Sequence, residues 1–85
     1  MLYYEKLDDQ ENILVEIWDG GPLSSEDAAR LCQISISYAS NILRHLWVDN
    51  YVKRNKVKMD SGGLKYEYKI SEKGSDLAEK LFARV

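Results

Sequence analysis

Apolar residues in the first part of the chain recur with the 3.6-residue period of an amphipathic helix. In the segment that begins at residue 9, this stripe consists of Ile13, Leu14, Ile17 and Trp18. Asp8 or Asp9 can cap the start of the helix, and the Gly-Gly-Pro sequence at residues 20–22 ends it. The pattern therefore predicts a first helix between residue 9 and these glycines.

Two more helices follow with a short connection between them. Ser24 stands three residues before Asp27, which is a short-armed form of the capping box and predicts a brief helix that ends near residues 32–33. Ser35 then caps a longer helix that continues to about residue 49. The inner stripe of this third helix consists of Ala39, Ile42, Leu43 and Leu46. A short helix followed at once by a longer one is the outline of a helix-turn-helix.

After Asn50 the period of the pattern changes from 3.6 to 2 residues. Residues 52–59 and 64–70 alternate between two faces, and an Asp-Ser-Gly-Gly sequence joins them. This predicts a half-buried antiparallel hairpin with a glycine-containing turn, which occupies about residues 51–70. Ser71 caps a last helix over about residues 72–84. Its apolar stripe consists of Leu77, Ala78, Leu81, Phe82 and Val85.

The composition is typical of one small globular domain over residues 1–85. Hydrophobic residues make up 45% of the 85 positions and aromatic residues 11%, which argues against disorder. The sequence has neither an apolar run of about 18 residues nor the layout of a signal peptide, so we expect no membrane association. A single cysteine, Cys32, cannot form an internal disulfide. We therefore expect a cytoplasmic location and a buried Cys32 thiol.

The sequence offers no arrangement of side chains that suggests catalysis. His45 is the single histidine, and neither a cysteine pair nor a carboxylate cluster stands at metal-ligand spacing. The acidic residues at positions 8, 9 and 11 suit the start of a helix, where negative charge is favourable. The glycine pairs lack the context of a phosphate-binding loop. We expect no enzyme activity, no metal and no cofactor.

Charge is distributed unevenly along a chain whose net charge is only −2. Residues 1–43 carry 2 basic and 8 acidic side chains, a balance of −6. Residues 44–73 carry 8 basic and 4 acidic side chains, a balance of +4. The basic segment covers the end of the third helix and the whole hairpin, and it indicates an anionic partner for that part of the molecule.

The order of the predicted elements resembles the winged helix-turn-helix superfamily of DNA-binding domains. The stretch LSSEDAARLCQISISYASNILRHLWVDNYVKR, residues 23–54, fits this superfamily without a gap, and YKISEKG, residues 68–74, resembles the end of its wing. Leu23 resembles the short first strand of the family. The resemblance covers residues 9–82 and is nearest to small MarR-like or archaeal single-domain transcriptional regulators. It implies an α+β, mostly helical fold with a three-helix core, a two-stranded wing and a C-terminal helix.

Two positions depart from the family pattern. Gln33 stands in the turn where many relatives have glycine, and Asn50 stands where many have glycine after the recognition helix. Asparagine is the next-best residue for a left-handed backbone, so Asn50 suits the same geometry. Gln33 leaves the conformation of the turn open.

The resemblance implies that the outer face of the third helix lies in the DNA major groove and that the wing contacts the backbone or minor groove. The implied contacts of this recognition helix are Ser35, Ser37, Tyr38, Ser40, Asn41, Arg44 and His45. Those of the wing are Arg54, Lys56, Lys58 and Lys65, of which the two lysines beside the turn are the best candidates. Each set also has a simpler interpretation, as a solvated polar face and as lysines that protect a sheet edge from aggregation.

Double-stranded DNA is therefore the expected partner, and the expected function is sequence-specific transcriptional regulation. Winged-helix regulators commonly form dimers through their terminal segments, which suggests a homodimer. Tyr3, Tyr4 and Phe82 lie near the termini, and Trp47 lies just off the inner stripe of the third helix, although core filling is the simpler interpretation for most of these aromatic residues. The alternative is a winged helix that acts as a protein-interaction module in a larger complex, an interpretation that the acidic first half favours. No residue points to a small-molecule effector, and the sequence leaves that question open.

Overall fold

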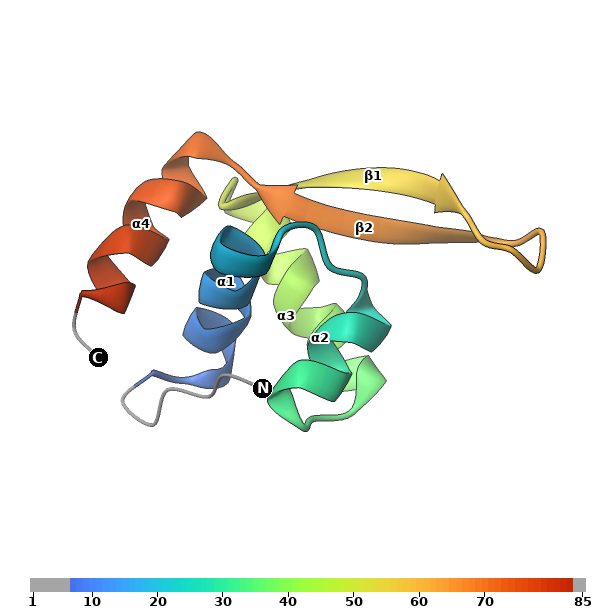
Figure 1. Cartoon of the computed structure of the whole chain (residues 1–85), viewed down its shortest axis with the longest axis horizontal. Helices are drawn as coiled ribbons and strands as arrows, with labels where there is room; N and C mark the ends of the chain where they lie inside the picture. Colours follow the sequence, from blue (N-terminus) through green and yellow to red (C-terminus); the bar gives the residue numbers. More distant parts are fainter. Residues whose placement is uncertain (1–6, 84–85) are drawn as a thin grey trace.

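The computed structural model describes residues 7–83 and consists of helices and a two-stranded hairpin (Figure 1). The elements, in chain order, are α1 (Asp9–Gly20), α2 (Ser25–Cys32), α3 (Ile36–Val48), β1 (Val52–Lys58), β2 (Leu64–Ile70) and α4 (Glu72–Phe82). This order confirms the predicted α+β, mostly helical fold, with a helix-turn-helix in α2 and α3 and a wing in β1 and β2. Tyr3, Tyr4 and Val85, which the sequence pattern assigns to the terminal segments, lie outside the described residues.

Each helix begins at the cap that its sequence supplies. Asp8 and Glu11 form a capping box at the start of α1, because each carboxylate accepts a hydrogen bond from the backbone N–H of the other residue. Ser24 and Asp27 form the same arrangement at α2. The hydrogen bond from the Ser24 N–H lowers the pKa of the Asp27 carboxyl. The caps of α3 and α4 are Ser35 and Ser71.

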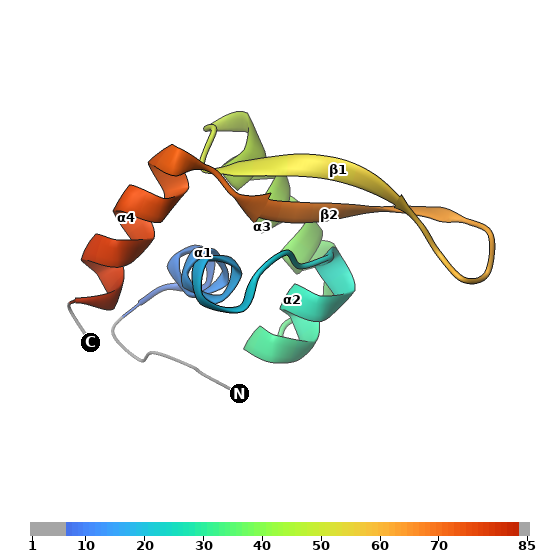
Figure 2. The ribbon, with the colours of Figure 1, turned by 45° about the horizontal axis from the view of Figure 1, so that its top comes forward.

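The core lies between α1 and the other three helices (Figure 2). Its largest fully buried apolar side chains are Ile13, Leu14, Ile17, Leu43, Leu46, Leu81, Val15 and Val52. Cys32 is also buried there, as predicted. Burial and, to a smaller extent, the nearby Glu16 carboxylate raise the pKa of the Cys32 thiol to about 11. This thiol is therefore protonated at neutral pH, as in a structural rather than a reactive cysteine.

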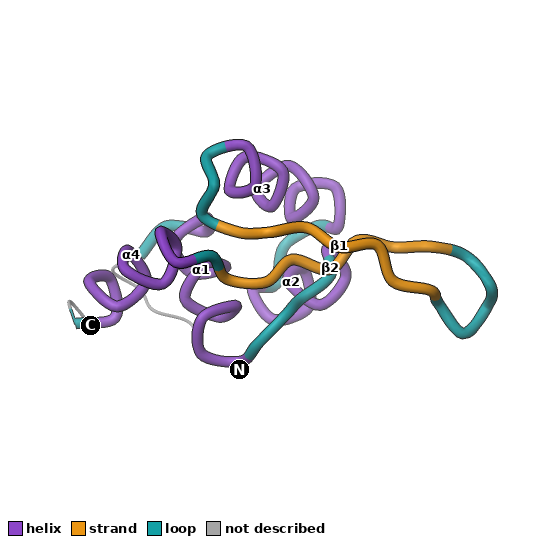
Figure 3. The backbone as a smooth tube through the Cα atoms, turned by 90° about the horizontal axis from the view of Figure 1, so that it is seen from above, coloured by secondary structure: helices purple, strands orange, loops and turns teal. Residues whose placement is uncertain are grey.

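The wing is an antiparallel hairpin that extends past the helices (Figures 1 and 3). Val52 lies opposite Ile70 at its base, and Lys58 lies opposite Leu64 near its tip. Leu23, before α2, pairs with Tyr68 through backbone hydrogen bonds of 3.0 and 2.8 Å. This bridge is the short first strand that the family resemblance implied, and it fixes the base of the wing to the helix-turn-helix.

The predicted half-burial of the hairpin is correct only at its base. Val52 is 2% exposed and Tyr68 4%, whereas Leu64 is 65% exposed and Tyr66 38%. The strands continue beyond the edge of the helical body, so their outer halves have no core to cover on either face (Figure 1). Regular alternation in the hairpin therefore indicates strand structure along its whole length, but it indicates burial only near the base.

Gln33 and Asn50 both adopt the left-handed backbone conformation, with φ values of 57° and 66°. The Gln33 N–H donates to the carbonyl of Ala29 and closes the end of α2. The turn between α2 and α3 thus keeps a helix-capping geometry although its residue is not glycine. The prediction for Asn50 is confirmed, and the question about Gln33 is answered in favour of the same geometry.

Helix α4 is attached to the connection between α3 and β1. The Ser71 hydroxyl donates to the carbonyl of Asn50 at 2.6 Å, and the Lys73 ammonium donates to the carbonyl of Asp49 at 2.9 Å. These bonds provide donors for the carbonyls of the two residues that directly follow α3. The end of the recognition helix, the base of the wing and the start of α4 are therefore held at one point.

Candidate nucleic-acid interface

Helix α3 turns its inner stripe into the core and its opposite face outward. Ala39, Ile42, Leu43 and Leu46 are buried, as predicted. The outer residues Ser35, Ser37, Tyr38, Asn41, Arg44 and His45 are exposed, and Ser40 is partly exposed. The outer face is therefore accessible along its length, with hollows on both of its flanks.

The flank beside the wing is a groove of about 320 Å³ between α3, the start of α2 and the hairpin. It brings together four predicted contact residues from two separate segments, namely Ser40, Arg44, Arg54 and Lys65. Glu26 is the single acidic residue in its lining. The groove is therefore predominantly basic, and we name it the wing-side groove.

Arg54 has a special position in the wing-side groove. Its guanidinium carbon lies 3.6 Å from the centroid of the Trp47 ring on α3 and 4.1 Å from that of Tyr66 on β2. Both distances are typical of cation–π contacts. The Lys56 ammonium lies farther from the Tyr66 ring, at 5.9 Å. Arg54 thus links the recognition helix to both strands of the wing.

Lys58 and Lys65 flank the tip of the wing, where they line a hollow with Met59, Asp60 and Ser61. Lys58 is exposed, and Lys65 is partly buried and also borders the wing-side groove. The two lysines therefore extend the basic surface from the recognition helix to the tip. Asp60 places one negative charge in the same turn.

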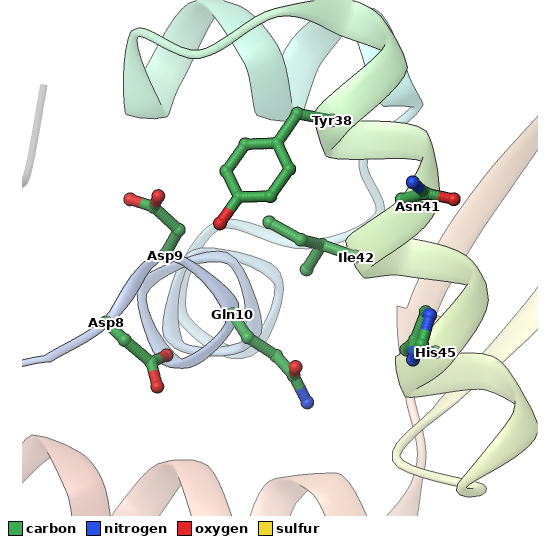
Figure 4. Close-up of a pocket in the computed structure, with 7 residues that line it drawn as sticks. All are labelled: Asp8, Asp9, Gln10, Tyr38, Asn41, Ile42 and His45. Atoms are coloured by element: carbon green, nitrogen blue, oxygen red, sulfur yellow. The ribbon is translucent and has the colours of Figure 1, made fainter.

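The other flank of α3 has the opposite charge. A hollow of about 340 Å³ lies between this flank and the start of α1, and it is lined by Asp8, Asp9, Gln10, Tyr38, Asn41, Ile42 and His45 (Figure 4). The Tyr38 hydroxyl points toward Asp9 (Figure 4), whose carboxylate is the first cause of the raised pKa of Tyr38. Tyr38 and His45 thus lie on one side of α3, and Arg54 and Lys65 lie on the other.

Several residues of the interface were not predicted from the sequence. Ile36 is 54% exposed at the start of α3 and lines the wing-side groove with Ser25. Trp47 and Tyr66, which contact Arg54, are not among the contacts expected from the sequence, because aromatic side chains at the margin of an apolar stripe usually complete a core. Their detection would have required the register between β1 and β2 and the direction of the wing relative to α3.

The described residues contain neither a group of three or more side chains that could hold a metal ion nor a helix that is long and apolar enough to cross a membrane. A search of curated proteins gives no match to this chain.

Solved structures of transcriptional regulators share the fold. A transcriptional regulator of Thermotoga maritima superposes with a TM-score of 0.73 at 26% identity, over 92% of this chain and 53% of the other. MepR of Staphylococcus aureus gives a TM-score of 0.73 at 19% identity, over 89% and 55% of the two chains. A transcriptional regulator homologue from Pyrococcus horikoshii gives 0.72 at 15% identity, over 87% and 72%. This chain thus spans about half the length of the first two.

The comparison with protein families agrees with the fold. The model of the HxlR-like helix-turn-helix family matches residues 10–83, which include every helix and both strands except the first residue of α1. The chain therefore belongs to the HxlR-like helix-turn-helix family.

Proposed function

We propose that this protein is a sequence-specific, double-stranded DNA-binding transcriptional regulator. The observation that carries the proposal is the wing-side groove, where the outer face of α3 and the basic wing converge on one accessible surface. Membership of a helix-turn-helix family supports the same function. Regulation of this kind is stoichiometric, because the protein occupies its DNA site and blocks or recruits the transcription machinery without a chemical step. It acts where the DNA is, in the cytoplasm.

In this proposal α3 enters the major groove and reads base edges. Asn41 and Arg44 are exposed on the outer face, and their side chains suit bidentate contacts with adenine and guanine, respectively. Ser37 and Ser40 are short, so the helix backbone can approach the floor of the groove. Ser35 and Ser37 can bond phosphates, and Tyr38 and His45 contact the DNA from the acidic flank.

The wing supplies electrostatic affinity. Arg54, Lys56, Lys58 and Lys65 neutralise phosphates beside the recognition helix, which a single arginine on α3 could not do alone. Each phosphate contact steepens the dependence of log affinity on log salt concentration by roughly 0.9. The wing thus sets the position and strength of binding, and α3 sets the sequence preference.

We also propose that the protein is a homodimer. Trp18 on α1 and Phe82 on α4 pack with ring centroids 5.5 Å apart, and Phe82 remains 42% exposed near the end of the described chain. Two copies joined near the end of α4 could contact two DNA half-sites roughly 34 Å apart. Size-exclusion chromatography with light scattering tests this part, because a monomeric mass at micromolar concentration contradicts it.

Selection from a randomised duplex pool tests the proposed function. The wild type should enrich a defined sequence motif, and Arg44→Ala should lose the preference at one position of it. Lys80→Ala is the matched control, because it removes one exposed positive charge on α4, away from the wing-side groove. Failure to enrich any motif, with no duplex binding at low salt, would instead favour a protein-interaction module, to which the acidic flank of α3 is suited.

A further inference from the structure

Arg54 differs from the other basic residues of the wing in being held by two aromatic side chains. Trp47 and Tyr66 contact its guanidinium at 3.6 and 4.1 Å, and Arg54 is partly buried. By contrast, Lys53, Lys56, Lys58 and Lys69 are exposed. A long side chain on an exposed strand normally samples many rotamers, and the two ring contacts restrict Arg54 to a small part of that range.

The ring contacts use the π surface of the rings and leave the N–H groups of Arg54 available. The one ion pair among the described residues joins Arg30 to Asp27, and the hydrogen bonds found in residues 7–83 include none from the Arg54 guanidinium. A guanidinium carries five N–H donors in its plane, and this arrangement matches two oxygens of a phosphate. Arg54 thus lies in the wing-side groove with its donor atoms uncommitted.

The surroundings of Arg54 also favour an anion. Arg44 and Lys65 line the same groove, and the Ser40 hydroxyl adds a neutral donor. Glu26 is the single carboxylate there, against three basic side chains. A cationic ligand would be repelled by this arrangement, whereas a phosphate would meet several donors and a net positive charge at once.

We propose that Trp47, Arg54 and Tyr66 form a preorganised phosphate clamp, in which Arg54 binds one DNA phosphate and the two rings are positioning residues. This inference rests on the proposed DNA-binding function and deepens it. The clamp joins α3 to both strands, so it also sets the angle at which the wing follows the backbone. The wing lysines act as mobile charges, and Arg54 acts as the fixed point between α3 and the wing.

The decisive variant is Arg54→Lys, which keeps the charge but loses the planar fork and its stacking. Affinity for the selected duplex should fall about five- to tenfold, because one oriented bidentate contact is lost, while the salt slope stays the same. Tyr66→Leu and Trp47→Leu should produce losses of the same kind, since Arg54 keeps its charge but not its orientation. Lys53→Arg is the control. Position 53 lies on the other face of β1, so this variant gains a guanidinium that neither Trp47 nor Tyr66 contacts.

A second measurement separates positioning from folding. The ring currents of Trp47 and Tyr66 should shift the Arg54 Nε–H resonance in the free protein, and binding of a short duplex should move it further. Each ring variant should lose the initial shift with an unchanged melting temperature, because both rings are more than one-third exposed. The inference is overturned if Arg54→Lys and Tyr66→Leu bind as the wild type does while Arg44→Ala weakens binding. If the wild type binds no duplex at all, the proposed function fails and the clamp fails with it.

Discussion

The backbone of Gly74 lies directly against the carbonyl oxygen of Tyr51. A Cβ atom at position 74 would overlap that oxygen and lie 2.9 Å from Ile70 Cδ1. This contact joins the first turn of α4 to the connection between α3 and the wing, next to the hydrogen bonds from Ser71 and Lys73. The glycine is therefore required by close packing at the point where three elements meet.

Gly74→Ala should destabilise the fold by about 1–3 kcal/mol, the usual cost of overpacking, because the obstruction is backbone and cannot rotate away. The melting temperature measures this effect. Gly20→Ala is the control, since position 20 has open space and no left-handed backbone, so its stability should remain close to the wild type. Equal melting temperatures for the two variants would show that α4 can shift away from Tyr51 at little cost.

Gln33→Gly should stabilise the protein by about 0.5 kcal/mol. Glycine removes the cost of a left-handed backbone at a residue with a side chain, and this gain exceeds the loss that comes from the greater entropy of glycine in the unfolded chain. For a domain of this size the melting temperature should rise by roughly 2–4 °C. Gln33→Ala keeps the penalty and should bring no increase. A larger gain from alanine than from glycine would mean that α2 continues through position 33 in solution.

Glu16 should make stability depend on pH. It is 8% exposed, its Oε1 atom lacks a hydrogen-bond partner among the described residues, and burial followed by the charge of Asp19 raises its pKa. The Glu16 carboxyl therefore binds a proton more tightly in the folded protein than in the unfolded chain. Its contribution to stability falls as the pH rises above 4.5, the ordinary pKa of a glutamate carboxyl.

Glu16→Gln removes this ionisation, and it should be more stable than the wild type at pH 7 by a margin that shrinks as pH falls toward 4.5. Denaturant unfolding of both proteins at several pH values measures the difference in their free energies of unfolding. Asp27, whose lowered pKa gives the opposite pH dependence, is present in both proteins, so its contribution cancels in this difference. A margin that grows on acidification would show that the Glu16 carboxylate has a stabilising partner in solution.

Much of this structure follows from local sequence signals. The helix starts are predictable because Asp8, Ser24, Ser35 and Ser71 satisfy backbone N–H groups within three residues of themselves. The hairpin is predictable because a glycine-containing turn separates two alternating arms. These signals operate over a few residues and require no knowledge of the tertiary arrangement.

The candidate interface is less accessible to such reasoning. The contacts of Arg54 with Trp47 and Tyr66 depend on how far the wing extends and toward which flank of α3 it leans. The acidic hollow beside Tyr38 joins residues about 30 positions apart in the chain, so no periodic pattern indicates it. Local patterns predicted which residues α3 exposes, but not that its two flanks carry opposite charge.

Asp9→Asn should increase DNA affinity about two- to threefold at low salt, because it removes a negative charge beside the recognition helix, and the gain should vanish as salt screens the interaction. Fluorescence anisotropy with a labelled duplex measures the change. Glu79→Gln on α4 is the control for loss of one exposed negative charge away from that face. An equal gain from both variants would show that net charge, rather than the acidic flank, limits affinity.

The most direct measurement is a titration of labelled duplex DNA at several salt concentrations with the wild type, Arg44→Ala and Lys58→Ala. The wild type should bind with a steep salt dependence, and Lys58→Ala should flatten the slope by roughly 0.9 while retaining the sequence preference. Arg44→Ala should weaken binding to the selected sequence by about 1–3 kcal/mol more than binding to a mixed sequence. Absence of binding at low salt, or indifference to both substitutions, would contradict the account of α3 and the wing as one DNA-binding surface.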